Sequence, residues 1–120
     1  MQRLRWLLAV VLGGLALFSA GAVTASAHAG STRSCSPVMN PYAGTRYEGV
    51  DLRRIRATGL SCHSARRVAS RAHRKALGLS VPSSGVRRFT WNGWRVTGDL
   101  RYSSDRYIAT RDGKRVSWRF

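Results

Sequence analysis

The stretch SCHSARRVASRAHRKALGL, residues 61–79, carries the clearest structural signal in the chain and decides the fold. Ser61 is a good helix N-cap, because its hydroxyl can accept a hydrogen bond from an early backbone N–H group. Gly78 followed by Leu79 is typical of a helix C-terminus. Between these ends, apolar residues recur at helical spacing on one side: Cys62, Ala65, Val68, Ala69, Ala72 and Ala76. The stretch predicts an amphipathic helix whose mostly alanine face can approach a sheet closely.

A strong hairpin signal follows this helix. The Asn-Gly pair at residues 92–93 favours a type I′ turn, in which both positions need a positive φ. It separates predicted strands at residues 86–91 and 94–97. Trp91 and Trp94 would then face each other as a cross-strand aromatic pair.

Three further strands complete the predicted sheet. Residues 106–111 and 114–120 form a hairpin around the Asp-Gly pair at 112–113, and residues 50–58 form a strand before the helix. The apolar residues of that earlier strand change parity midway, which indicates either a β-bulge or pairing of its second half only. In the last strand, three residues share one parity and should face the core: Val116, Trp118 and Phe120. The predicted fold class is α+β, with one amphipathic helix packed on a small antiparallel sheet in the order β-α-β-β-β-β.

The N-terminal segment predicts export. Two arginines precede the apolar run WLLAVVLGGLALF at residues 6–18, and small residues follow, which is the order of a secretory signal peptide. We expect this peptide to span residues 1–27, with an alternative end at 29. An uncleaved anchor is the competing interpretation, but a membrane span needs about 20 apolar residues. The mature protein would be secreted or associated with the cell envelope, without a transmembrane span. It would consist of an irregular arm at residues 28–49 and an α+β domain at residues 50–120.

The two cysteines, Cys35 and Cys62, would reach an oxidising compartment together, where an even count favours a disulfide. The bridge would close a loop of about 27 residues and stabilise the fold by about 3.5 kcal/mol in the chain-entropy model. Two free thiols are the alternative.

Basic residues dominate the composition of the 120-residue chain. It has 21 lysine and arginine residues against 5 acidic residues, for a net charge of +16. A chain of this length holds one small domain, which excludes a multidomain enzyme and a multi-span membrane protein. Two cysteines and three histidines cannot fill a strong metal motif, so we expect no metal site and no cofactor.

This charge predicts acidic partners, because arginine binds phosphate bidentately and strong basic fields attract polyanions. The candidate anion-binding residues on the predicted helix are Arg66, Arg67, Arg71, Arg74 and Lys75. Trp91 and Trp94 are candidate stacking residues. Other basic residues are expected on strands and loops: Arg87, Arg88, Arg95, Arg101, Arg106, Arg111, Arg115 and Arg119.

The expected partners are acidic polymers or an anionic lipid surface, with nucleic acid as a nonspecific ligand. Simpler explanations stay open for both features. A GC-rich genome favours arginine codons, and a charged helix face often only solvates the helix. Trp91 and Trp94 could simply pack against each other in the hairpin. We expect a monomer.

A ribonuclease-like hydrolase is the enzymatic alternative, because small basic exported proteins with a helix and antiparallel strands share that outline. Its chemistry needs a general base and a general acid, and Glu48 with His63 could supply them. A histidine on a helix surface is far more often a solvated side chain, so we expect a non-enzymatic binding module without catalytic residues. The other alternative is a secreted protein-interaction module that uses the Trp91–Trp94 hairpin.

The segment IRATGLSCHSARRVA, residues 55–69, resembles the SC-x-x-AR-x-V segment of small secreted actinobacterial proteins of unknown function. Their Gly-Trp pair and terminal G-x-x-V-x-[FW] motif are similar to residues 93–94 and to GKRVSW at residues 113–118. Such relatives commonly carry two more cysteines, where this chain has Val96 and Ala109. The resemblance implies a fold, an export route and the remaining Cys35–Cys62 bridge. It implies no activity.

Overall fold

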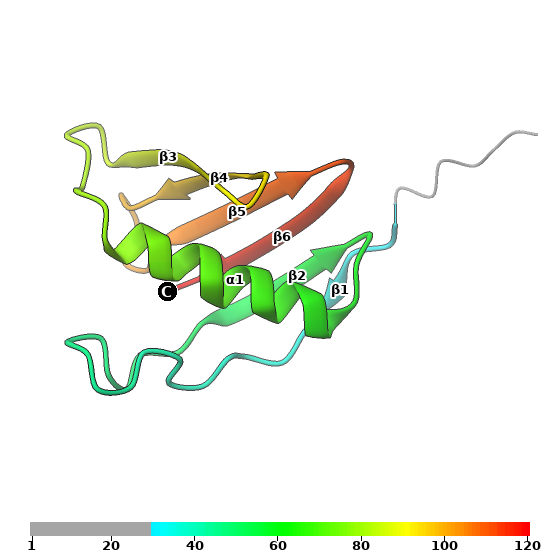
Figure 1. Cartoon of the computed structure of the whole chain (residues 1–120), viewed down its shortest axis with the longest axis horizontal. Helices are drawn as coiled ribbons and strands as arrows, with labels where there is room; N and C mark the ends of the chain where they lie inside the picture. The colour runs from blue at the N-terminus through cyan, green and yellow to red at the C-terminus, as the bar shows by residue number, and fades with distance from the viewer. Residues whose placement is uncertain (1–29) are drawn as a thin grey trace, which may run out of the picture.

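The computed structural model describes residues 30–120, so the signal peptide predicted at residues 1–27, with its alternative end at 29, lies outside the described residues. One helix, α1 (Cys62–Leu77), packs on a six-stranded antiparallel sheet. The strand order is β1-β2-β6-β5-β4-β3, and α1 runs across one face of this sheet (Figure 1). The strands are β1 (Arg33–Ser34), β2 (Arg53–Thr58), β3 (Val86–Trp91), β4 (Trp94–Asp99), β5 (Arg106–Arg111) and β6 (Lys114–Arg119). The predicted α+β fold is confirmed.

The helix α1 begins and ends where the sequence predicts. The Ser64 N–H group donates a hydrogen bond of 3.1 Å to the Ser61 hydroxyl, which is the predicted N-cap. At the other end, the Gly78 N–H group donates to the Lys75 carbonyl. The buried face contains the predicted apolar residues and one histidine: Ala65, Val68, Ala69, Ala72, His73 and Ala76.

Both predicted hairpins are present. Trp91 pairs with Trp94 across the first turn, and the turn residues Asn92 and Asp112 have φ values of 46° and 47°. Such positive φ values are what type I′ turns require. Strand β4 continues past the predicted end at residue 97, because Gly98 lies directly under the Tyr107 ring, where a Cβ atom would collide with it.

The prediction of an irregular arm at residues 28–49 is wrong for part of that segment. Strand β1 lies within it and pairs with β2, and Val38 forms a further bridge with Leu52. Tyr42 is buried in the core, and its hydroxyl donates a 2.8 Å hydrogen bond to the Ser70 carbonyl. These partners are distant in sequence, so the local composition of the arm does not reveal them.

The predicted disulfide between Cys35 and Cys62 is present. It joins the segment after β1 to the first turn of α1. The Cys35 N–H group also donates to the Ile55 carbonyl at 2.8 Å, so the arm is tied both to the helix and to β2.

A β-bulge in β2 explains the change of apolar parity between residues 50 and 58. The register against β6 shifts between Arg53 and Arg56, and Arg54 has a φ of 49°. This extra residue allows both Leu52 and Ile55 to be buried although three positions separate them.

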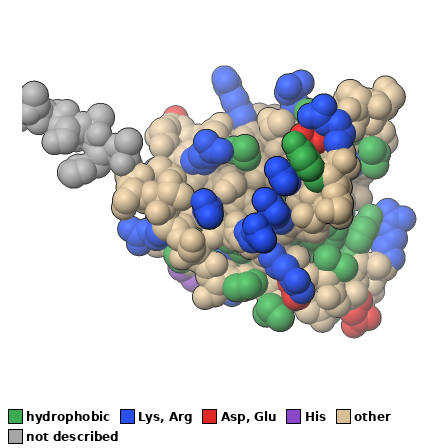
Figure 2. Space-filling view, turned by 180° about the vertical axis from the view of Figure 1, so that it is seen from behind, with side chains coloured by type: hydrophobic (Ala, Val, Ile, Leu, Met, Phe, Trp, Pro, Cys, Tyr) green, Lys and Arg blue, Asp and Glu red, His purple; other side chains and the backbone are tan. Residues whose placement is uncertain are grey.

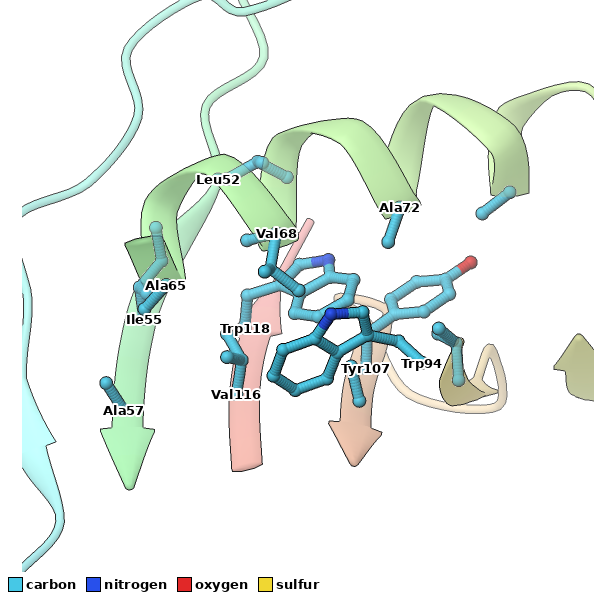
Figure 3. Close-up of a cluster of buried hydrophobic side chains, with 14 of the residues drawn as sticks. Leu52, Ile55, Ala57, Ala65, Val68, Ala72, Trp94, Tyr107, Val116 and Trp118 are labelled. Carbon is cyan, nitrogen blue, oxygen red and sulfur yellow. The ribbon is translucent and has the colours of Figure 1, made fainter. Parts of the chain in front are cut away.

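The core lies between α1 and the sheet, with small residues on the helix and large ones on the strands. Figure 3 shows Ala65, Val68 and Ala72 of α1 above the strand side chains. The Tyr107 and Trp118 rings are stacked, with their centroids 5.4 Å apart. The alanine-rich helix face thus leaves room for these rings, and the close helix–sheet approach that the sequence predicts is achieved.

The structure corrects the sequence-based placement of Arg87 among the surface cations. Its side chain is buried, and its guanidinium donates to the Ala76 carbonyl at 2.8 Å, the Leu79 carbonyl at 3.0 Å and the Tyr107 hydroxyl at 3.1 Å. Arg87 therefore caps the C-terminal end of α1 from a neighbouring strand, and it is not exposed to an external anion.

Candidate anion-binding face

Three of the five helix cations proposed from the sequence have partners within the protein. Arg66 donates to the Pro37 carbonyl at 3.1 Å, and Lys75 donates to the Thr90 carbonyl at 2.6 Å. The Arg74 guanidinium lies 5.7 Å from the centre of the Tyr42 ring. These contacts attach α1 to the arm and to β3. They indicate a structural role for much of the predicted binding face.

Arg67 and Arg71 are exposed and border a hollow of about 180 Å³ that also contains Trp91. Trp94, the other predicted stacking residue, is only 5% exposed and belongs to the core. The two tryptophans therefore differ in role: Trp94 packs inside the protein, while Trp91 keeps part of its ring at the surface.

The face of the sheet opposite α1, here called the open face, carries a much larger basic surface. Its side chains alternate along each strand with the buried ones. Figure 2 shows lysine and arginine side chains spread across this side of the molecule. The open face consists mainly of arginine, serine and threonine, with Val86, Asp99 and Ile108 as the exceptions: Arg54, Arg56, Thr58, Val86, Arg88, Thr90, Arg95, Thr97, Asp99, Arg106, Ile108, Thr110, Arg115, Ser117 and Arg119.

A hollow of about 290 Å³ lies on the open face over β2, β6 and β5. We call it the arginine hollow; its side chains are those of Arg54, Arg56, Arg106, Ile108, Arg115, Ser117 and Arg119. Among residues 30–120, none of its five arginines forms an ion pair with a carboxylate. The hollow therefore concentrates positive charge, which Asp99, the cross-strand neighbour of Arg106, offsets only in part.

The electrostatics of Arg119 reflect this concentration. Burial lowers the pKa of its guanidinium, and the positive charges of the neighbouring Arg54 and Arg106 lower it further. Arg106 is held by Tyr102, whose ring centre lies 3.8 Å from its guanidinium carbon. An anion placed between these groups would relieve their mutual repulsion.

A second hollow, of about 630 Å³, continues the basic surface toward the two hairpin turns. We call it the hairpin hollow; its polar lining includes Thr58, Arg95, Thr110, Arg111, Asp112, Lys114 and Arg115. Arg115 lines both hollows. The two hollows thus form one basic track over the open face.

The acidic residues lie at the margins of the arginine hollow, and Asp99 on β4 is the direct cross-strand neighbour of Arg106. Asp51 pairs with Arg53 at 3.5 Å, and Asp112 lies 3.6 Å from Arg111 at the hairpin tip. Asp99 forms a 2.8 Å ion pair with Arg101, whose hydrogen bonds lower the pKa of Asp99 to about 2. These three carboxylates thus form ion pairs with arginines at loops and strand ends, and within residues 30–120 none of them forms an ion pair with an arginine of the hollow.

Two members of this site, Arg54 and Arg56, were not among the anion-binding residues predicted from the sequence. The alternation of charged and apolar residues at 54–57 was the available signal, but the bulge obscured its parity. Arg115 and Arg119 were expected among the basic residues of the strands and loops, and they line the open face together with Ser117. Only the pairing of β6 with both β2 and β5 brings the two groups together.

The structure does not bring the two candidate catalytic residues together. His63 lies in the first turn of α1, whereas the loop residues just before Glu48 lie toward the far end of the helix, where Thr45 and Tyr47 line a hollow with Gly78. A helix of 16 residues is roughly 24 Å long. Glu48 and His63 are therefore not arranged as an acid–base pair.

Comparison with known proteins gives no match: no family model, no curated protein and no solved structure is similar to this chain at a significant level. Within residues 30–120, no helix has the length and apolar character needed to cross a membrane. The same residues contain no cluster of three or more histidine, cysteine or acidic side chains able to hold a metal ion.

Proposed function

We propose that this protein is an exported, monomeric, non-enzymatic binding module that holds anionic polymers against the open face of its sheet. The observation that carries this proposal is the arginine hollow and its continuation into the hairpin hollow. Guanidinium groups bind phosphate and sulfate groups bidentately, and a row of them favours a ligand with repeated negative charges. The proposed site therefore lies on the sheet and not on the helix.

The composition of the open face favours a soluble polymer over a membrane as the ligand. Ile108, 38% exposed, and the half-buried Val86 are its apolar side chains, and most of the surrounding residues are arginine, serine and threonine. Such a surface has little apolar area to insert between lipids, so its attraction to a bilayer would be electrostatic only. Cell-wall polymers and extracellular nucleic acid supply the repeated charges without requiring insertion.

A salt series tests the proposal. The oxidised protein would be titrated with polyphosphate, single-stranded DNA, anionic vesicles and neutral vesicles between about 50 and 200 mM salt. We expect log K for the polymers to fall linearly with log salt, because binding releases condensed counterions. Flat and weak binding to every polyanion would overturn the proposal and would favour the Trp91 hairpin as a surface for a protein partner.

Matched variants locate the binding surface. Arg56→Gln with Arg115→Gln removes two charges from the open face, and Arg67→Gln with Arg71→Gln removes two from α1. For single-stranded DNA we expect the first pair to reduce the salt slope by about 1.4, at roughly 0.7 for each lost phosphate contact. The helix pair should change it much less. Equal effects of the two pairs would show that binding depends only on net charge.

A further inference from the structure

The arginine hollow has a geometry suited to one compact anion in addition to a general attraction for polymers. Arg119 lies opposite Arg106 on β5 and opposite Arg53 at the bulge in β2, while Arg56 lies opposite Ser117 in the next row. Neighbouring strands are about 4.8 Å apart, and alternate residues of a strand are about 6.7 Å apart. The Cα atoms of the arginines in these two rows therefore lie within an area of roughly 7 by 10 Å. Side chains as long as arginine can reach a common point from there.

The β-bulge raises the density of arginine at this point. In a regular pairing one residue of β2 would lie between the partners of Arg119 and Ser117, but the register shift leaves two there, Arg54 and Ile55. Arg53 is engaged by Asp51, whereas Arg54 lines the hollow. Arg54 also has a φ of 49°, a left-handed conformation that costs a residue with a Cβ roughly 1–3 kcal/mol when held in a fold.

The hollow also offers groups suited to a phosphate group. The Ser117 hydroxyl lies among the guanidiniums and forms no hydrogen bond within residues 30–120. Arg106 is positioned by the Tyr102 ring and forms no ion pair in the same residues, although Asp99 is its cross-strand neighbour on β4. Bidentate arginine contacts and a hydroxyl donor can together satisfy several oxygens of one anion.

We propose that the arginine hollow is a subsite for a phosphate dianion, namely the terminal phosphomonoester of a soluble anionic polymer. This inference rests on the proposed function and specifies the chemistry of its central site. A phosphodiester carries one negative charge, whereas a phosphomonoester carries close to two above its second pKa of about 6. The five arginines that line the hollow with Ser117 match the phosphomonoester better, because it carries the larger negative charge.

Two small probes separate the possibilities: methyl phosphate, which becomes a dianion, and dimethyl phosphate, which stays a monoanion. Their binding to the oxidised protein would be followed by calorimetry and by NMR shifts at constant ionic strength. At pH 8 we expect methyl phosphate to bind at least tenfold more tightly than dimethyl phosphate. At pH 5 this preference should shrink to a few-fold, because the phosphomonoester gains a proton while arginine keeps its charge.

The variant Arg54→Gly tests the residue at the bulge. Glycine adopts a positive φ without strain, so the variant should keep or raise Tm while weakening methyl phosphate binding at least tenfold. Arg54→Lys keeps the charge but loses the bidentate geometry and should restore binding only in part. The control Arg67→Gln removes one charge from α1, on the other side of the sheet, and should leave methyl phosphate binding within about twofold.

The outcomes separate the subsite from the proposed function. Polymer binding with a steep salt slope, but equal affinity for the two small probes, would overturn the subsite and leave the function intact. Equal losses in Arg54→Gly and Arg67→Gln would overturn the subsite as well. Absence of polymer binding would overturn the proposed function, and a preference for methyl phosphate would then support a small-molecule site in the same hollow.

Discussion

Acid should unfold this protein largely through His73, a histidine enclosed by aromatic rings. Its side chain is fully buried, with the Phe120 ring centre 4.1 Å away and the Tyr107 ring centre 4.7 Å away. Trp118 Nε1–H donates to His73 Nδ1 at 3.2 Å, which requires that nitrogen to be unprotonated. Burial, followed by the charge of Arg87, lowers the pKa of His73 from 6.5 to about 3.

The sign and size of the effect follow from this pKa. Because the folded pKa lies below the unfolded one, the unfolded chain binds more protons between about pH 6.5 and pH 3. The stabilisation is therefore complete above pH 6.5 and is lost as the pH falls. Between pH 7 and pH 4 the loss of unfolding free energy is about 3 kcal/mol. This is a large part of the stability of a small domain.

Denaturant titrations at pH 7, 6, 5 and 4 measure this loss. His73→Phe keeps an aromatic ring but leaves the Trp118 indole N–H group without its acceptor, so it should lower stability at pH 7 by about 1–3 kcal/mol. Between pH 7 and pH 4, the unfolding free energy of this variant should fall by about 3 kcal/mol less than that of the unaltered protein. The exposed His63, changed to Phe, serves as the control and should retain the full acid dependence. Equal acid losses in the protein and in His73→Phe would refute the role assigned to His73.

Three other changes should destabilise the fold in measurable ways. Replacing both Cys35 and Cys62 by alanine should lower the unfolding free energy by about 3.5 kcal/mol, seen as a lower denaturant midpoint. Arg87→Met should remove the charged donor from the Ala76 and Leu79 carbonyls at the end of α1; a loss of about 2–4 kcal/mol is expected, and a loss below about 1 would contradict the capping role. Gly98→Ala should place a methyl group against the Tyr107 ring and lower Tm by several degrees, and an unchanged Tm would show that this ring can move aside.

The sequence predicted the chemistry of the candidate site, which is anion binding by arginine, but it predicted the wrong location for it. Net charge and arginine content predict attraction to anions, and both are properties of composition. The helix appeared to be the binding element because its cations are neighbours in the sequence. In the structure Arg66 and Lys75 donate to backbone carbonyls of other segments, and the free arginines gather on the open face.

The sequence by itself determined the elements whose causes are local. The cap at Ser61, the apolar period of α1 and the positive φ at Asn92 and Asp112 depend on neighbours along the chain. Helix ends and hairpin registers could therefore be predicted. The disulfide followed from cysteine count and the expected compartment.

Only the tertiary structure decided the contacts between distant segments. The pairing of β6 with β2 joins residues about 60 positions apart, and no local pattern specifies it. That pairing sets Arg56 beside Ser117 and creates the arginine hollow. In the same way, packing makes His73 a core residue and Arg87 a helix cap. A polar side chain becomes buried or exposed according to the partners that the folded chain provides, and those partners come from elsewhere in the sequence.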